Sequence, residues 1–200
     1  MVKRGAVFID NGYWVKTTLF SPTSPDWVVK NIVSWCPELK NVEQWMVYVY
    51  DAEYDLESVP FYESQLMIPR GIAKYHRREL QELRDRGFCV RVGGYVPRNE
   101  NGLSRMQQKG VDSLIVIDAM DELHHFNTDT FVFFASDRDF VPVFKRILMG
   151  VDEGARAYMF FSSLTGKTGI ETSVPELRVR DVQGAKWVQG GELRAKRGAK

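Results

Sequence analysis

Two carboxylates follow a run of large apolar residues that is typical of a buried strand. In "FVFFASDRDFVPVF" (residues 131–144), the apolar run is followed by Ser136, Asp137, Arg138 and Asp139. An earlier run, "AVFID", ends in Asp10, and Asp112 opens a helix-like segment that precedes residue 131. Like charges that lie close together repel, and each is costly to bury without a partner. If the fold brings these residues together, a compensating cation is needed.

The chemistry that suits such a cluster is divalent metal binding. Mg²⁺ and Mn²⁺ prefer hard oxygen ligands such as carboxylates and water. A cation held in this way can activate a bound water and stabilise charge on a phosphoryl group, as phosphodiester hydrolysis requires. The alternative for any single residue is helix capping, because an Asp after a strand often accepts a backbone N–H. Asp118 lies inside an apolar helix-like segment, where it either supports the site or faces solvent.

The elements that must position these residues alternate between strands and helices. Continuous apolar runs predict strands at residues 6–10, 45–51, 88–92, 131–135 and 156–161, with a possible sixth at 186–189. Helical apolar spacing predicts helices at residues 25–35, 70–87, 109–125 and 138–150. This alternation predicts an α/β fold with a mostly parallel sheet of about five to six strands and helices on both faces. Sites in such sheets form at the carboxyl ends of the strands, where Asp10 and Asp137 are expected.

The remaining segments set the limits of the domain. The polar stretch at residues 93–108 shows no periodicity and is expected to be a long, functional loop. We expect one domain over residues 1–190 and a basic, disordered tail over residues 191–200.

Composition narrows the class of protein. The chain has 200 residues, with 27 Lys and Arg against 26 Asp and Glu, so its net charge does not mark it as a nucleic-acid binder. Its two cysteines, Cys36 and Cys89, form no metal-binding motif and suit a reducing compartment. Because the sequence shows neither a signal peptide nor a segment that could span a membrane, we expect a cytoplasmic protein.

Four ordered segments carry a resemblance to a known family. "VFIDNGY", "QKGVDSLIVIDAM", "FFASDRDFVPVF" and "SVPELRVRD" together resemble the NYN domains, in particular the LabA-like branch of the PIN-like nuclease superfamily. The resemblance implies a three-layer, Rossmann-like PIN fold and a Mg²⁺- or Mn²⁺-dependent endoribonuclease. Many NYN domains have an Asn three residues after the first Asp, whereas this chain reads Asp10-Asn11-Gly12-Tyr13, so Asn11 could replace that amide.

Carried over by motif position, the resemblance implies these roles. The metal ligands would be Asp10, Asp112 and Asp137, and Asp139 would complete the catalytic set. Supporting positions would be Asn11, Lys109, Ser136 and Asp118.

An acidic cleft repels RNA, so binding requires cations nearby. Candidate RNA-binding residues, on a helix-like segment and in the polar stretch, are Arg70, Lys74, Arg77, Arg98 and Arg105. The alternative for the helical residues is a solvated helix face. For the whole chain, the alternatives to a ribonuclease are a non-catalytic module that binds RNA or a protein and a phosphatase that acts on small substrates. A homodimer or a protein partner is also compatible with the sequence.

Overall fold

The structure is a computed structural model of the 200-residue chain. It describes residues 2–18, 20–55, 70–100, 103–135, 137–149, 156–161, 174, 176–181, 186–188 and 192–193. Ser136 and the stretch at 56–69 therefore lie outside the described residues.

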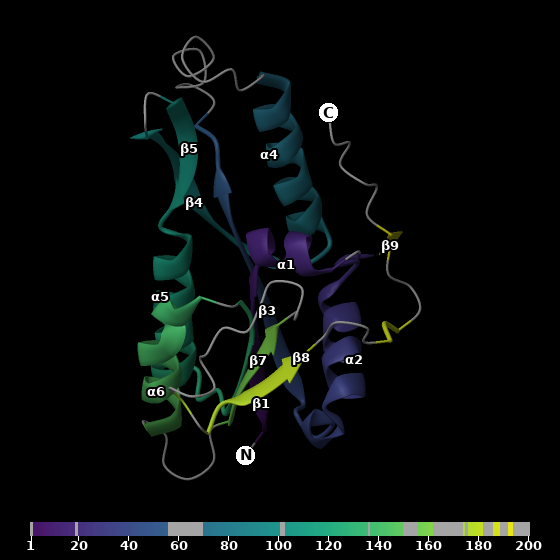
Figure 1. The fold of residues 1–200 in the computed structure, drawn as a ribbon. Coiled ribbons are helices and arrows are strands. Elements are labelled where there is room, and N and C mark those ends of the chain that lie inside the picture. Colours follow the sequence, from purple (N-terminus) through teal and green to yellow (C-terminus); the bar gives the residue numbers. More distant parts are fainter. Residues whose placement is uncertain are drawn as a thin grey trace.

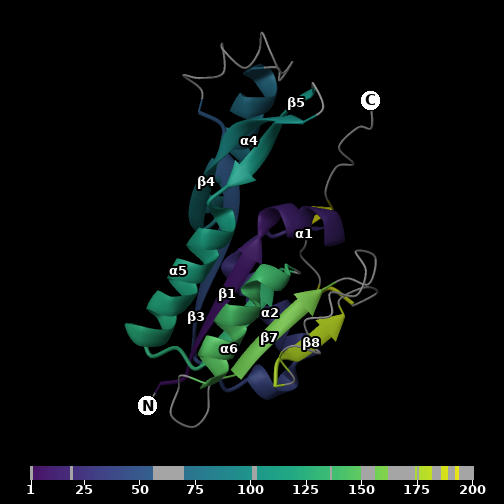
Figure 2. The same ribbon diagram turned by 60° about the vertical axis from the view of Figure 1, so that its left-hand side comes forward.

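A seven-stranded sheet forms the centre of the described fold, with the strand order β5-β4-β3-β1-β6-β7-β8 (Figures 1 and 2). All neighbouring strands pair in parallel except β4 and β5, which are antiparallel. The strands are β1 (Arg4–Asp10), β3 (Gln44–Glu53), β4 (Cys89–Glu100), β5 (Leu103–Lys109), β6 (Thr130–Phe134), β7 (Arg156–Phe161) and β8 (Arg178–Asp181). The predicted α/β fold with a mostly parallel sheet is confirmed, and β5 and β8 are the strands that the prediction missed.

Helices cover both faces of this sheet, as predicted (Figure 1). One face packs against α5 (Val111–His124) and α6 (Val141–Met149), and the other packs against α1 (Asn11–Thr17), α2 (Pro25–Trp35) and α4 (Arg70–Asp85). Two short 3₁₀ helices, η1 (Pro37–Leu39) and η2 (Arg138–Phe140), complete the helical elements of the described residues. No helix in the described part of the chain is long and apolar enough to cross a membrane.

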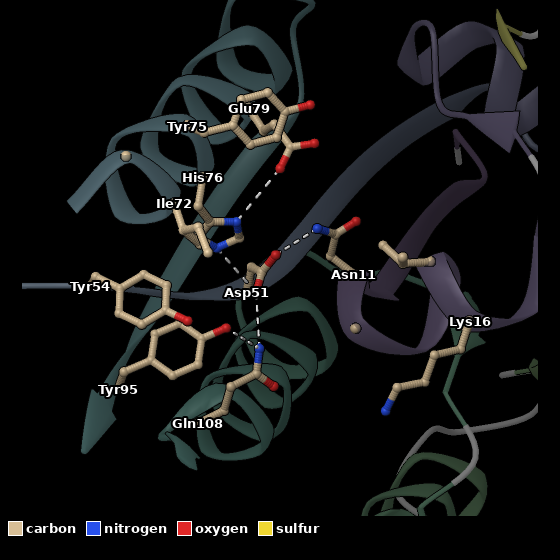
Figure 3. A pocket seen from close by; sticks show the side chains of 13 residues that line it. Asn11, Lys16, Asp51, Tyr54, Ile72, Tyr75, His76, Glu79, Tyr95 and Gln108 are labelled. Atoms are coloured by element: carbon tan, nitrogen blue, oxygen red, sulfur yellow. Dashed lines mark hydrogen bonds and ion pairs between the residues drawn. The ribbon is translucent and has the colours of Figure 1, made fainter. Parts of the chain in front are cut away.

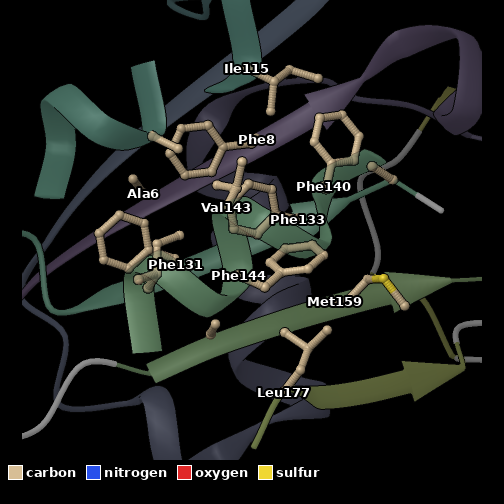
Figure 4. Packing of buried hydrophobic residues seen from close by; sticks show 14 of the residues in the cluster. Ala6, Phe8, Ile115, Phe131, Phe133, Phe140, Val143, Phe144, Met159 and Leu177 are labelled. Carbon is tan, nitrogen blue, oxygen red and sulfur yellow. The ribbon is translucent and has the colours of Figure 1, made fainter. Parts of the chain in front are cut away.

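The central strands are buried on both faces, which explains their continuous apolar sequences. In β1, Phe8 packs toward α5 and α6, whereas its neighbour Ile9 packs toward α1 and α2. In β6, Phe133 and Phe134 alternate in the same way, and Phe133 contacts Phe144 of α6 edge to face (Figure 4). Because both faces need apolar side chains, β1 and β6 hold no acidic residue before their carboxyl ends, where Asp10 ends β1 and Asp137 follows β6.

Two regions differ from the sequence prediction. The expected loop at 93–108 is instead a hairpin, because β4 continues to Glu100 and its residues 94–100 pair with the whole of β5. The possible strand at 186–189 does not form in its described part, 186–188, which packs on α2 through Trp187. Trp187 stacks on Trp27, and beyond it β9 (Glu192–Leu193) pairs with β2 (Phe20–Ser21).

Candidate functional site

The strand order places the candidate site beside the end of β1. This strand lies between β3 and β6, and the chain leaves it toward α1 on one face while α5 covers the other. Where the connections that follow two neighbouring strands lie on opposite faces of the sheet, a crevice forms at the carboxyl ends of those strands. Asp10 is the last residue of β1 and lies at this point.

Asp10 has a structural role as well as a position in the crevice. Its carboxylate caps α1, with Oδ1 accepting the backbone N–H of Tyr13 at 3.0 Å. Burial raises the pKa of Asp10, and the negative charges of Asp112 and Asp51 raise it further. Capping still leaves the carboxylate able to act as a ligand, because it has two oxygens and about four lone-pair sites.

Asp137 lines the same pocket as Asp10, although the two are far apart in sequence. Asp137 follows β6 and caps η2, with Oδ1 accepting the backbone N–H of Asp139 at 3.0 Å. The pocket measures about 440 Å³, and Asp10 and Asp137 both line it. Its other lining residues are Gly12, Tyr13, Lys16, Gln108 and Arg138.

The start of α5 brings a third carboxylate toward this pocket, and two glycines make its placement possible. Gly110 adopts a φ of 83° just before α5, a conformation that favours glycine. A Cβ on Gly93 would lie 2.3 Å from the carbonyl oxygen of Lys109, so only glycine allows β4 to pass so close to the turn. Asp112, in the first turn of α5, has its pKa raised by burial and then by the charges of Asp137 and Asp139.

The donor set of this pocket, which we call the acidic pocket, fits a hard divalent cation held partly by water. No three His, Cys, Asp or Glu side chains among the described residues are placed to hold an ion together. Mg²⁺ is usually bound by one or two carboxylates and keeps several water ligands. Asp10 and Asp137 provide two such carboxylates from a rigid sheet edge, and a cation there would offset the charge that Asp112 adds.

A second pocket opens next to the acidic pocket, at the carboxyl end of β3. It measures about 770 Å³ and lies between α1, α4 and the β4–β5 hairpin (Figure 3). Gly12, Lys16 and Gln108 line both pockets, so the two adjoin. We call the second one the tyrosine pocket, because its walls include Tyr54, Tyr75 and Tyr95.

An ion pair forms the floor of the tyrosine pocket. Asp51 is 4% exposed, and its carboxylate accepts hydrogen bonds from Asn11 Nδ2 and Gln108 Nε2. His76 Nε2 lies 3.6 Å from Asp51 Oδ1, and Nδ1 lies 3.8 Å from Glu79 Oε2. Burial alone would lower the pKa of His76, but its interactions with these two carboxylates, and the Ala52 carbonyl oxygen 2.8 Å from Nε2, raise it to about 10. Burial alone would raise the pKa of Asp51, but the nearby His76 and the hydrogen bond from Asn11 lower it. The pair is therefore charged at neutral pH.

The supporting residues predicted from the sequence have different positions. Asn11 lines the tyrosine pocket and donates a hydrogen bond to Asp51, so its amide fixes the floor of that pocket. Lys109 is exposed at the end of β5. Asp118 is buried away from both pockets, where it accepts hydrogen bonds from the Tyr50 hydroxyl at 3.0 Å and from Arg91 Nε at 2.9 Å.

The predicted cationic residues also have different positions. Lys74 is exposed on α4, whereas Arg77 forms an ion pair with Glu53. The backbones of Arg70, Arg98 and Arg105 belong to α4, β4 and β5, and their side chains lie outside the described residues. Lys16, which lies on α1 and lines both pockets, was missed by the sequence prediction.

Asp51 and His76 were missed as well, although the sequence contains a signal for one of them. Asp51 interrupts the apolar run "WMVYVYDAEY" at the strand that pairs with β1, and the register aligns Asp10 with Tyr50, its neighbour. A charged residue at that depth predicts a partner. That partner, His76, comes from α4, and nothing in its spacing from Asp51 indicates the contact.

Comparisons with known proteins agree with this architecture. The chain is similar in fold to a protein of unknown function from Vibrio parahaemolyticus RIMD 2210633 (VPA0982), with a TM-score of 0.50 and 13% identity over 90% of this chain and 93% of that chain. No curated protein matches the sequence. The sequence model of the NYN domain matches residues 6–158, which include all four predicted catalytic carboxylates. NYN domains are a PIN-like nuclease family, and this chain belongs to it.

Proposed function

We propose that the protein is a Mg²⁺- or Mn²⁺-dependent endoribonuclease of the LabA-like branch of the NYN family. One observation supports the proposal most strongly. Asp10 and Asp137, 127 positions apart in the sequence, line one pocket at the carboxyl edge of the sheet, and the charge of Asp112 reaches Asp10. Capping alone does not account for this, because each Asp could cap its helix without lining the same pocket.

The proposed roles follow from position. Asp10 and Asp137 hold the cation with water, and Asp112 adds negative charge beside them. When bound, the cation lowers the pKa of a water and stabilises negative charge on the phosphoryl oxygens. Lys16 lies at the junction of the two pockets, where its ammonium group can bind the phosphate backbone.

Asp139 completes the proposed reaction. It is exposed next to Asp137 and can take the proton of the attacking water. The water oxygen bonds to phosphorus, the bond from phosphorus to the leaving ribose oxygen breaks, and that oxygen takes a proton from solvent.

Cleavage of single-stranded RNA tests the proposal, with matched carboxylate variants. Asp10→Asn and Asp137→Asn should each lower the Mn²⁺-dependent rate at least about 100-fold, because each removes a ligand charge. Asp121→Asn is the control, because Asp121 is an exposed carboxylate at the far end of α5 from Asp112. Cleavage that persists in Asp10→Asn and Asp137→Asn would refute the proposal.

The second candidate is a non-catalytic RNA- or protein-binding module with the same fold. The helix-capping bonds of Asp10 and Asp137 favour it, because they give both residues a structural role that needs no metal ion. Thermal unfolding with Mn²⁺ separates the two candidates, because a ligand that binds only the folded state raises its stability. A nuclease should be stabilised by Mn²⁺, and Asp137→Asn should remove that effect. If the protein is a non-catalytic module, Mn²⁺ should not change the unfolding temperature of the unsubstituted protein or of Asp137→Asn.

The proposed setting is the cytoplasm. Cys36 and Cys89 are both thiols, which suits a reducing compartment. The proposed domain is residues 1–190, followed by a basic tail. RNA is the proposed partner, and a homodimer or a protein partner remains a sequence-based prediction.

A further inference from the structure

The tyrosine pocket has the size and walls of a ligand site. Its volume of about 770 Å³ lies within the range of about 300–1,000 Å³ that is typical of small-molecule sites. Tyr75 is 60% exposed and Ile72 is 52% exposed, and these two neighbours on α4 both line the cavity (Figure 3). Next to His76 of the same helix, Tyr54 stacks on Tyr95 with ring centroids 4.0 Å apart, and both rings line the cavity. Aromatic side chains therefore form a large part of the pocket wall.

The floor of this pocket is polar and held in place. Asp51 accepts hydrogen bonds from Asn11, Gln108 and the backbone of Ala52, and His76 lies beside it. Gln108 also donates to the Tyr95 hydroxyl at 3.3 Å, so the floor and one aromatic wall are linked. A cavity with aromatic walls and a fixed polar floor suits a flat, heteroaromatic ligand, because such a ring stacks on its faces and hydrogen-bonds at its edge.

The position of the pocket identifies the chemistry of that ligand. The acidic pocket adjoins it at Gly12, Lys16 and Gln108, so a ligand that extends across both pockets would suit them if it carried an anionic, cation-binding group such as a phosphate next to an aromatic ring. A nucleotide within a nucleic-acid strand has this arrangement. Bases in a duplex are already stacked on one another, whereas an unpaired base is available to stack on tyrosine.

We propose that the tyrosine pocket binds an unpaired nucleobase of the strand whose phosphate enters the acidic pocket. This inference rests on the proposed function, because the acidic pocket defines where the phosphate lies. Tyr75 and Ile72 form one wall of the base site, and Lys16 contacts the phosphate between the two pockets. The protein therefore selects single-stranded over double-stranded RNA.

Binding without cleavage tests the base site. Fluorescence anisotropy in EDTA would measure the affinity for a short labelled single-stranded RNA, for a duplex of the same sequence and for an abasic strand of equal charge. Stacking of one base is worth about 5- to 150-fold in affinity, so Tyr75→Ala should weaken binding to the single-stranded RNA by a factor in that range. Tyr75→Phe keeps the ring and should retain most of the affinity. Binding to the abasic strand and to the duplex should not change in either variant.

The chain offers a matched control for the second wall residue. Ile72 and Ile117 are 52% and 51% exposed, and both lie on helices, but only Ile72 lines the pocket. Ile72→Ala should weaken binding to the single-stranded RNA, and Ile117→Ala should leave it unchanged. Because these side chains are exposed, none of the variants should lose thermal stability.

The outcomes separate this inference from the proposed nuclease. The base site is refuted if Tyr75→Ala binds the single-stranded RNA as tightly as the unsubstituted protein does. It is also refuted if the unsubstituted protein binds the abasic strand as tightly as the single-stranded RNA. Both conclusions hold whether or not RNA is cleaved. If the affinity depends on Tyr75 and on the base but no cleavage occurs with Mn²⁺, the base site is supported and the nuclease proposal fails.

Discussion

The ion pair between His76 and Asp51 makes the stability of the protein depend on pH in a specific way. The pKa of His76 is about 10 in the folded protein, against 6.5 for an ordinary histidine. The stabilisation from the charged imidazolium is therefore fully present below about pH 6.5 and is lost as the pH rises through about 10. The pKa of Asp51 is lowered largely by the same contact with His76, so it adds no separate stabilisation energy for this pair.

The size of the effect follows from the geometry. The difference between a pKa of about 10 and 6.5 sets an upper limit of roughly 5 kcal/mol, at about 1.4 kcal/mol per unit. The His76 side chain is 13% exposed and its nitrogen lies 3.6 Å from Asp51 Oδ1, so solvent screens part of this energy. We expect His76→Gln to lower the free energy of unfolding by about 3 kcal/mol at pH 6, within the range for a broken buried pair.

Urea unfolding of both proteins at pH 6 and pH 10 measures this effect. Other groups that titrate over this range are shared by the two proteins and cancel in the difference. The gap in free energy of unfolding should be about 3 kcal/mol at pH 6 and should narrow by at least about 1 kcal/mol at pH 10. A gap that stays constant, or that widens at pH 10, would show that the imidazolium is not the source of the stability.

Three further predictions concern the hairpin, the core and the acidic pocket. Gly93→Ala places a Cβ 2.3 Å from a backbone carbonyl oxygen, so it should lower the free energy of unfolding, measured in urea, by about 2 kcal/mol. Gly94→Ala is the control, because a Cβ there meets no atom within 4 Å, and it should change this free energy by less than about 0.5 kcal/mol. Phe133→Ala removes a fully buried ring and should cost about 3–5 kcal/mol in the same assay. Burial and nearby carboxylates raise the pKa of Asp10 in the metal-free protein, so Mn²⁺ binding should strengthen as the pH increases through a midpoint above 3.8. Asp112→Asn removes one of these charges and should shift that midpoint to lower pH when Mn²⁺ binding is measured by calorimetry across pH; a shift to higher pH would contradict the electrostatic coupling.

The parts of the fold that the sequence predicted are those with a strong apolar pattern. The strand that ends at Asp10 and the strand that precedes Asp137 are buried on both faces, so their continuous apolar runs are distinctive. Because the carboxyl ends of parallel strands lie at one edge of a sheet, the strand pattern of the sequence predicts that Asp10 and Asp137 lie at the same edge, where both line the acidic pocket.

The parts that the sequence did not predict lack such a pattern. The sequence of the hairpin over residues 93–108 is largely polar, and its second strand, β5, is the outermost strand of the sheet. It therefore shows no alternation of apolar residues, and from the sequence it was interpreted as a loop. The role of His76 depends on where α4 packs relative to β3, which is a tertiary contact. Lys16 belongs to α1, a helix too short to give a clear periodic signal.

The most direct test of the central proposal is anomalous X-ray diffraction from crystals soaked in Mn²⁺. We expect a peak in the acidic pocket in contact with the carboxylates of Asp10 and Asp137, with water completing the ligand shell. The same soak of Asp137→Asn crystals should give a much weaker peak. A saturating soak that leaves this pocket without a peak, or that places Mn²⁺ only elsewhere on the protein, would contradict the proposed metal-dependent nuclease.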